Sequence, residues 1–415
     1  MERSYASSRA LVRRAGGPLA THLDGYVSGL INCRYTTSVV YVKVRHAAAF
    51  DRWLAKRRYA VADLGEGHVE LFQRRARPIG RRVAPKTLCS EQREVLYFLQ
   101  FLRTRGVCRP IVLQRSRAEQ WAGRYAAYLR SQQGLTCATV ERYEAVALQF
   151  LRERFGCGDV QLRVLDAEDV IAFMRRRAKE LRPLTLRCVG NALRSFFRYL
   201  QYCGETAVVL EAAVPAVATW VTTPALPKAI APEHAQRAID SCDPGAMAGL
   251  RDRAVLLLLA RLGLRAHEIV ALQLEDCDWG CGHLRVHGKG GREVLLPMPQ
   301  DVGKAIGAYL QHGRPPSADR HLFLRAQAPY RGLTTGSDVI GAIVRYALER
   351  AGVVAPHRGS HQFRHALAMR LLQAGASFPE IGEVLRHRSP QSTSIYARVD
   401  LSALRPLALP WPGGA

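Results

Sequence analysis

Four short stretches in the C-terminal half of the sequence carry basic residues, histidines and a tyrosine: LGLRAHEI at 262–269, GKGG at 288–291, HQFRH at 361–365 and LRHRSPQSTSIY at 385–396. Two guanidiniums can clamp a phosphate and stay charged at any working pH. A tyrosine hydroxyl can attack the phosphorus, and a general acid can protonate the oxygen that leaves. Together these residue types could break and rejoin a phosphodiester without a metal. The candidate residues are Arg265, Lys289, His361, Arg364, His387 and Tyr396, with Glu268 in support.

The elements around the first stretch explain the positions of its charged residues. A strongly apolar helix is predicted over Leu250–Leu262, and Gly263 ends it. Arg265 and Glu268 then begin the next element. A carboxylate three residues beyond an arginine can hold its guanidinium in place.

The other stretches lie on a predicted hairpin and a predicted helix. The segments His283–His287 and Arg292–Pro297 alternate with period 2 on either side of a glycine-rich turn. This pattern predicts an antiparallel β-hairpin with Lys289 at its tip. His361 and Arg364, three residues apart, share one face of a helix.

Each stretch taken alone has a more ordinary interpretation, as a surface arginine, a structural histidine or a packed tyrosine. His361 and His365 have the spacing of zinc ligands on a helix, but position 362 is Gln where a zinc-protease helix has Glu. The ten cysteines form no CxxC pair, and Cys277 and Cys281 have no second pair at zinc-ribbon spacing. We therefore expect reduced thiols and no metal.

Composition indicates a globular protein with a polyanionic partner. The 415 residues suit two to four domains, and 48% of them are apolar. The longest plainly apolar run, 254–260, is too short to span a bilayer, and the first residues have no signal-peptide core. The formal charge of +25 favours nucleic acid as the partner. We expect a cytoplasmic protein that associates with the nucleoid when bound to DNA.

The fold is predicted to be mainly α with one small antiparallel β-sheet. Helical patterns flank the hairpin, and a Pro-, Ala- and Thr-rich segment at 213–228 predicts an interdomain linker. The predicted helices of the C-terminal part are Pro232–Ser241, Leu250–Leu262, Asp301–His312, Gly336–Ala351, His361–Ala374 and Phe378–Leu385.

The N-terminal half contains an apparent internal repeat with offsets between 97 and 101 residues. The segment from Leu64 to Arg75 matches that from Leu165 to Arg176, and Phe98–Leu102 matches Phe196–Leu200. Trp53-Leu54 is matched with Phe150-Leu151. We infer two tandem helical units, at 40–112 and 117–212, after an N-terminal extension at 1–39. Chance similarity between amphipathic helices is the alternative.

The segment from Arg74 to Arg117 has twelve Lys or Arg residues and two Glu. A solvated face is the ordinary explanation of such a run, but the net charge favours a surface that follows DNA phosphates. The DNA-binding candidates are Arg74, Arg75, Arg77, Arg81, Arg82, Arg142 and Arg187.

In order and spacing, the four stretches resemble those of the tyrosine recombinase (phage integrase) family. The combination of GLRxxE, GKGG, HxxRH and LRHRSxxxTxxY carries the resemblance, which covers a catalytic domain at 229–405. More loosely, the unit at 117–212 resembles the family's SAM-like core-binding domain, and 406–415 remains as a C-terminal tail. Arg386 occupies a position where the family usually has glycine, and Arg292 one where lysine is common.

The resemblance implies a role for each candidate residue. Tyr396 would be the nucleophile that forms a 3′-phosphotyrosyl link, and Lys289 the general acid for the 5′-oxygen. Arg265 and Arg364 would bind the scissile phosphate. His361 would assist proton transfer at the tyrosine, and His387 would hydrogen-bond the phosphate, with Glu268 in support.

The resemblance also implies a reaction without a cofactor, and its partners. Site-specific recombination of duplex DNA by four protomers on two duplexes is expected, with integration or transposition of a mobile element as its role. Two alternatives remain open: a type IB topoisomerase or telomere resolvase, which shares the chemistry, and a DNA-binding protein of this fold that has lost catalysis. The apolar residues that follow Tyr396 could dock on a neighbouring protomer or back onto the protomer to which they belong.

Overall fold

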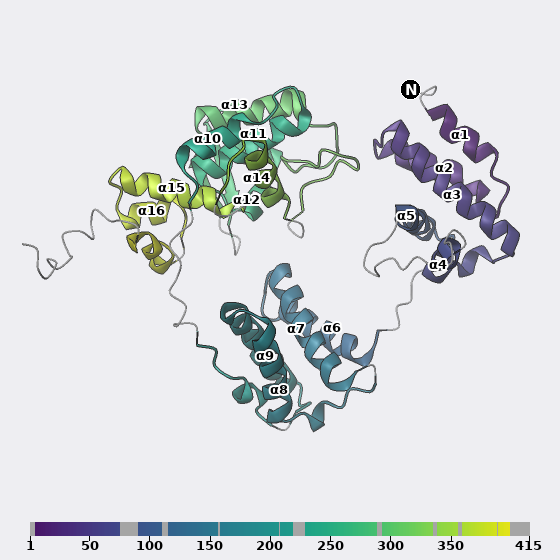
Figure 1. The fold of residues 1–415 in the computed structure, drawn as a ribbon, viewed down its shortest axis with the longest axis horizontal. Coiled ribbons are helices and arrows are strands. Elements are labelled where there is room, and N and C mark those ends of the chain that lie inside the picture. Colours follow the sequence, from purple (N-terminus) through teal and green to yellow (C-terminus); the bar gives the residue numbers. More distant parts are fainter. Residues whose placement is uncertain are drawn as a thin grey trace, which may run out of the picture. The chain divides into compact units, whose positions relative to one another are not determined.

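The computed structural model describes residues 5–74, 90–109, 115–156, 158–206, 208–218, 229–288, 293–334, 338–355, 359–387 and 389–398. Contacts divide the chain into two units, Val112–Pro224 and the combination of Met1–Ile111 with Ala225–Ala415. The described elements are mostly helices, with one small sheet, so the predicted fold class is confirmed (Figure 1). None of the described helices is both long and apolar enough to cross a membrane.

In the first helical region, the described residues form helices around an aromatic core. Its elements are α1 (Ala6–Arg13), α2 (Ala20–Asn32), α3 (Thr37–Arg57), η2 (Val61–Asp63), α4 (Glu66–Arg74) and α5 (Ser90–Thr104). The buried carboxylate of Asp51 on α3 accepts the backbone N–H groups of Gly17 and Leu19 at 2.9 and 2.7 Å. A Cβ at Gly17 would lie 2.4 Å from Asp51, so glycine permits this close approach. The turn before α2 is thereby tied to α3.

The second helical region has a separate core. Its elements are α6 (Arg117–Ser131), α7 (Cys137–Phe155), η3 (Leu162–Val164), α8 (Ala167–Glu180), α9 (Pro183–Tyr202) and η4 (Leu210–Ala213). Capping boxes begin two of the helices, Ser116 with Glu119 at α6 and Asp166 with Asp169 at α8. These caps satisfy N–H groups that have no partner within the helix.

The two helical regions share a pattern of aromatic contacts. Phe50 and Phe72 meet edge to face with ring centroids 5.2 Å apart, and Phe150 and Phe173 do so at 5.4 Å. The contact of Tyr26 with Phe98 at 4.8 Å likewise corresponds to that of Tyr125 with Phe196 at 5.1 Å. These parallels support the inferred duplication and pair α2–α5 with α6–α9.

The structure corrects one boundary of the predicted repeat and leaves one match of residues a prediction. Phe50 and Trp53 both meet Phe72 edge to face, at 5.2 and 5.7 Å, so the match of Trp53-Leu54 with Phe150-Leu151 stays a prediction. The segment at 1–39 was interpreted as an extension, yet α2 lies within it and contributes Leu23, Tyr26 and Leu30 to the core of the first region. Tyr26 and Leu30 of α2 correspond to Tyr125 and Leu129 of α6 at the same spacing, a match that the sequence comparison did not include.

The C-terminal region packs helices around the apolar helix α11. Its elements are α10 (Pro232–Asp240), α11 (Met247–Leu262), α12 (Ala266–Ala271), η5 (Leu274–Asp276), α13 (Gln300–Ala308), η6 (Tyr309–Gly313), α14 (Val339–Arg350), α15 (His361–Gln373), α16 (Phe378–Val384), η7 (Pro390–Ser392) and η8 (Ser394–Arg398). Residues from 254 to 260 of α11 are buried, as the apolar run predicted.

One three-stranded antiparallel sheet accompanies these helices. Strands β1 (Cys277–Asp278), β2 (His283–His287) and β3 (Glu293–Pro297) lie in that order, and β2 pairs with β3 from His283↔Pro297 to His287↔Glu293. The predicted hairpin is confirmed, while residues 289–292 between its strands lie outside the described part of the chain.

Candidate active site

The start of α12 carries a buried carboxylate that holds Arg265. Gly263 ends α11 in the left-handed conformation, with φ of +58°, and Arg265 is the residue before α12. Glu268, only 1% exposed, accepts the backbone N–H of Arg265 at 2.8 Å and its Nη1 at 2.7 Å. Burial opposes ionisation, but the Arg265 N–H and the charges of Arg386 and Arg265 lower the pKa of Glu268 overall. The carboxylate is therefore ionised and fixes the guanidinium.

The second guanidinium, that of Arg364 on α15, is held by backbone carbonyls. Its Nη1 donates to the carbonyl of Gly263 and its Nη2 to that of Leu385, and the residue is 3% exposed. Burial, together with the positive charges of Arg265 and Arg386, lowers the pKa of Arg364 to about 10. The group thus stays charged at neutral pH.

The turn after α16 connects the two arginines. The carbonyl of Leu385 accepts from Arg364, and the next carbonyl, that of Arg386, accepts Nη2 of Arg265 at 3.2 Å. Arg386 has a φ of +55°, a left-handed conformation that glycine adopts without strain. Two successive carbonyls of this turn therefore position both guanidiniums.

The side chain of Arg386 returns to the same carboxylate. Its Nη2 donates to Oε2 of Glu268 at 3.1 Å, and the side chain is 11% exposed. Burial lowers the pKa of Arg386, against the effect of Glu268. The arginine that replaces the family's usual glycine therefore keeps the glycine-like backbone conformation and adds a third guanidinium beside Glu268.

His387 lies next in the chain and contacts a threonine. Its Nδ1 is 2.7 Å from Oγ1 of Thr393, which is buried. Desolvation, followed by the charges of Arg364 and Arg265, lowers the pKa of His387 to about 4. The ring is therefore neutral at physiological pH.

Tyr396 lies on η8 and is 1% exposed. It packs with Leu367, Ala368, Ile381 and Leu385 in a small core. Burial raises the pKa of Tyr396 to about 12, although the charge of Arg364 opposes the shift. The hydroxyl is 2.8 Å from Nδ1 of His365.

His361 contacts the ring of His365, with the two centroids 5.2 Å apart. Desolvation and the charges of Arg364 and Arg265 lower the pKa of His361. The resemblance assigned proton transfer at Tyr396 to His361, whereas the imidazole that contacts the tyrosine hydroxyl is that of His365, one helical turn further on.

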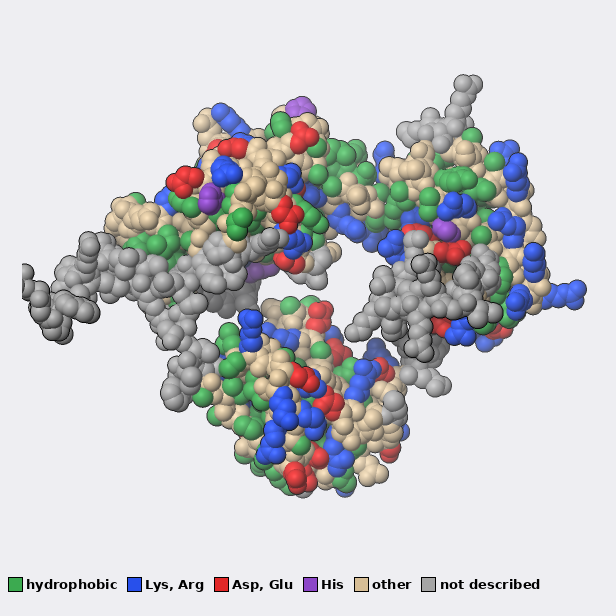
Figure 2. Space-filling view, viewed as in Figure 1, with side chains coloured by type: hydrophobic (Ala, Val, Ile, Leu, Met, Phe, Trp, Pro, Cys, Tyr) green, Lys and Arg blue, Asp and Glu red, His purple; other side chains and the backbone are tan. Residues whose placement is uncertain are grey.

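The structure thus brings together five of the six predicted catalytic residues and Glu268. Lys289, the sixth, lies outside the described residues, as do the DNA-binding candidates Arg75, Arg77, Arg81 and Arg82. Arg74 on α4, Arg142 on α7 and Arg187 on α9 are exposed. On the face of the described residues in Figure 2, Lys and Arg side chains are interspersed with Asp and Glu.

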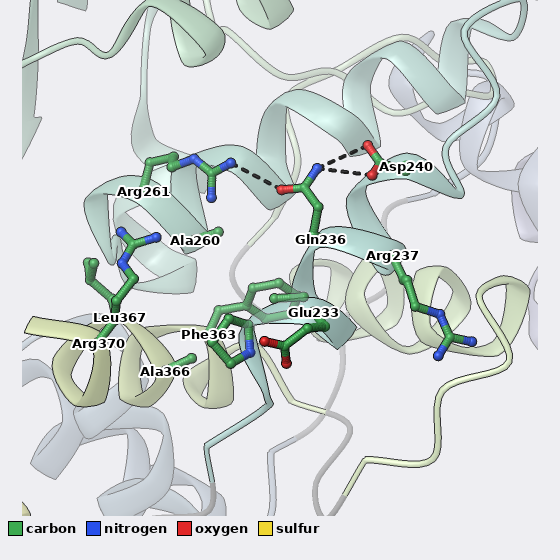
Figure 3. A pocket seen from close by; sticks show the side chains of 12 residues that line it. Glu233, Gln236, Arg237, Asp240, Ala260, Arg261, Phe363, Ala366, Leu367 and Arg370 are labelled. Carbon is green, nitrogen blue, oxygen red and sulfur yellow. Dashed lines mark hydrogen bonds between the residues drawn. The ribbon is translucent and has the colours of Figure 1, made fainter. Parts of the chain in front are cut away.

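A pocket of about 530 Å³ lies between α10, α11 and α15 (Figure 3). It is lined by residues of α10, α11 and α15, among them Phe363, Leu367 and Arg370, and by none of the catalytic candidates. Across its rim, Arg261 donates to Gln236, which donates to Asp240. The catalytic candidates belong instead to the region where α12, α15 and the turn after α16 meet.

Three residues of this site were not among the predicted site residues. His365 and Thr393 occupy defined positions of the quoted motifs, HxxRH and LRHRSxxxTxxY. Their presence in these motifs was the signal by which the sequence could have indicated them. Arg386 was visible as a departure from the family pattern, but its pairing with Glu268 required the fold.

Comparisons with known proteins agree with this geometry. The model of the "Phage integrase family" matches residues 228–402. The chain is 40% identical to "Putative integrase/recombinase y4rA" of Sinorhizobium fredii (strain NBRC 101917 / NGR234), over 98% of both chains. It is 27% identical to "Tyrosine recombinase XerD" of Listeria monocytogenes serotype 4b (strain F2365), over 66% of this chain and 91% of that protein.

The solved structures add a likeness of fold. The XerH site-specific recombinase, bound to its palindromic difH substrate in a post-cleavage complex, matches with a TM-score of 0.54. The match covers 72% of this chain and 98% of XerH at 20% identity. Together with the 40% identity to y4rA over nearly the full length of both chains, these findings show that the chain belongs to the phage integrase family of tyrosine recombinases and is a site-specific DNA recombinase.

Proposed function

We propose that the chain cuts and rejoins duplex DNA at recombination sites through a covalent link between Tyr396 and a DNA 3′-phosphate. The observation that carries this proposal is the turn at Leu385 and Arg386, whose successive carbonyls hold the guanidiniums of Arg364 and Arg265. Both cations are thereby fixed before any substrate binds. Preorganised positive charge stabilises the transition state of phosphoryl transfer without reorganisation during the reaction.

In the proposed reaction, the oxygen of Tyr396 forms a bond to phosphorus as the bond from phosphorus to the 5′-oxygen breaks. Arg265 and Arg364 neutralise the charge that grows on the phosphate oxygens. His387, a neutral ring whose Nδ1 can accept the hydroxyl of Thr393, then has its proton on Nε2 and can donate it to a phosphate oxygen. The leaving oxygen takes a proton from Lys289, the acid that the sequence predicts. Rejoining is the reverse.

The phosphotyrosyl link conserves the energy of the broken bond, so the reaction needs no cofactor. We propose that four protomers act on two duplexes and that the role is integration or transposition. The name of y4rA, an integrase/recombinase, supports this role, and XerH, crystallised on its substrate difH, supports duplex DNA as the partner. While acting, the protein would be bound to DNA of the nucleoid in the cytoplasm.

The domain boundaries remain part of the proposal. The units at 117–212 and 229–405 would supply core binding and catalysis, and the first helical region would be a second DNA-binding unit. The exposed residues Arg74, Arg142 and Arg187 would contact phosphates. Replacing all three with Glu should weaken binding and reduce its dependence on salt, and an unchanged slope of log affinity against log salt would contradict this role.

Covalent capture on nicked DNA tests the proposed reaction. Duplex fragments from the DNA that flanks the gene are nicked, so that the short leaving strand diffuses away and the adduct is trapped. The wild type should yield an adduct that survives denaturation, Tyr396→Phe should yield none, and Tyr346→Phe, at an exposed tyrosine of α14, should match the wild type. An undiminished adduct from Tyr396→Phe, or none from the wild type, would contradict the proposal.

A further inference from the structure

Among the described residues, the imidazole that contacts the hydroxyl of Tyr396 is not that of the histidine expected from the family pattern. Nδ1 of His365 lies 2.8 Å from the tyrosine oxygen, with the two rings edge to face and their centroids 5.7 Å apart. We propose that His365 is a catalytic residue that accepts the proton of Tyr396 as the tyrosine attacks the phosphate. This inference rests on the proposed role of Tyr396 as the nucleophile.

The tyrosine needs a proton acceptor because its surroundings oppose ionisation. Tyr396 is 1% exposed, and burial raises its pKa to about 12. A phenol in this environment keeps its proton at neutral pH and is a weak nucleophile. A base within hydrogen-bond distance removes the proton while the new bond forms.

The position of His365 is fixed from two sides. It lies on α15 directly after Arg364, whose guanidinium is tied to the carbonyls of Gly263 and Leu385. On its other side Tyr396 packs against Leu367 and Ala368 of the same helix. The helix that positions a phosphate-binding arginine therefore also presents the base to the nucleophile, within a single turn.

The neighbouring groups are less suited to this role. Arg364 is cationic and has no lone pair to accept a proton. His387 has its Nδ1 beside Thr393, and the lowering of its pKa to about 4 makes it a weak base. His361 contacts the ring of His365, so it is a candidate to stabilise that ring rather than to contact the tyrosine.

The proton and the bonds balance in this step. As the tyrosine oxygen bonds to phosphorus, its proton moves to Nδ1 of His365 and forms an imidazolium. The bond to the 5′-oxygen breaks, and that oxygen takes a proton from the general acid. In rejoining, the imidazolium returns its proton to the leaving tyrosine oxygen, so no other reactant is consumed.

The test compares His365→Asn with the wild type in single-turnover adduct formation on the nicked duplex. Asn can accept the tyrosine hydrogen bond through Oδ1 but cannot take up its proton, so the rate should fall by about 100-fold or more. His312→Asn, at an exposed histidine of η6, should leave the rate unchanged. Gel-shift binding of the same duplex and the melting temperature show whether each variant folds, and His365→Gln is measured in parallel.

A second substrate separates the two proton transfers. A duplex with sulfur in place of the bridging 5′-oxygen has a leaving group that needs no protonation. It should restore the rate of Lys289→Ala but not that of His365→Asn. The proposal would be overturned if folded His365→Asn formed the adduct as fast as the wild type or faster, or if the sulfur substrate restored the rate of this variant. In all three cases Tyr396→Phe would still report separately on the nucleophile.

Discussion

Arg265 and Arg364, the two arginines proposed to bind the phosphate, are held in different ways. Arg364 is tied to the carbonyls of Gly263 and Leu385, whereas Arg265 pairs with the carboxylate of Glu268. Burial and the positive charges of Arg265 and Arg386 lower the pKa of Arg364 to about 10, and its carbonyl partners carry no full charge to oppose this shift. Arg364 therefore depends on backbone carbonyls, whereas Arg265 depends on one ionised side chain in addition to the carbonyl of Arg386.

Removing the arginine held by the backbone should have the largest effect. Arg364→Ala deletes one phosphate contact and should lower the single-turnover rate of adduct formation by about 100- to 1,000-fold. It also leaves buried carbonyls without their donor, at a cost of about 1–3 kcal/mol of unfolding free energy each. Arg370→Ala, at an exposed arginine of the same helix, is the matched control and should change neither quantity. A wild-type rate in Arg364→Ala would mean that the arginine held by backbone carbonyls does not stabilise the transition state.

Neutralising the carboxylate should affect the other arginine. Glu268→Gln leaves Arg265 and Arg386 without their common counter-ion, and breaking a buried pair of this kind costs about 3 kcal/mol. Chemical denaturation measures this loss. Glu275→Gln, at an exposed pair with Arg320, should cost far less. Equal losses in the two variants would mean that burial of Glu268 does not increase the contribution of its ion pairs to the free energy of unfolding.

The same pair should make stability depend on pH on the acid side. The pKa of Glu268 is lower in the folded chain than its ordinary value, so its contribution is fully present above the unfolded-state pKa. That contribution is lost as pH falls through the folded-state pKa. Denaturation curves from pH 7 to pH 3 should show the difference between the wild type and Glu268→Gln shrinking towards acid pH. A difference that stays constant over this range would contradict the assignment.

Arg386 contributes to the site through its backbone and its side chain. Its carbonyl accepts a hydrogen bond from Arg265, and its guanidinium donates one to Glu268. Arg386→Gly keeps the left-handed backbone and relieves about 1 kcal/mol of strain while it loses the pair with Glu268. Arg386→Val keeps the strain and loses the pair. Gly should therefore be the more stable variant, by about 1–2 kcal/mol in chemical denaturation. Equal stabilities would mean that the conformation at 386 is not left-handed in solution.

The smallest effect is expected at Thr393, which contacts His387 and neither arginine. Thr393→Val keeps the shape of the side chain but removes one hydrogen bond, so the rate of adduct formation should fall by about 3- to 10-fold. Thr393→Ser, which retains the hydroxyl, should restore most of the rate. A loss as large as that of Arg364→Ala would show that the orientation of His387 matters as much as the phosphate contact.

Local pairs of this site could be predicted from the sequence, and distant ones could not. Glu268 follows Arg265 by three residues, so helix geometry alone indicated their contact. The carbonyl partners of Arg364 are 101 and 21 positions away, and the partner of Tyr396 is 31 positions away. Backbone acceptors leave no mark on the residue types of a sequence. In the sequence, Arg386 was therefore recognisable only as an unusual residue type at its position.

The helical regions show the same limit. Buried aromatics such as Phe72, Phe98, Phe173 and Phe196 gave a period that predicted the repeat. The match of Trp53 to Phe150 stays a prediction, because Phe50 and Trp53 lie one turn apart and both meet Phe72 edge to face. Two aromatic residues that are equivalent in the sequence pattern are therefore also alike in this contact of the core.

Peptide mapping of the covalent adduct tests the central claim most directly. The trapped complex is digested with protease and nuclease, and mass spectrometry locates the residue that carries the nucleotide. The account predicts a 3′-phosphonucleotide on Tyr396 alone. A nucleotide on another residue, or one attached through a 5′-phosphate, would contradict it.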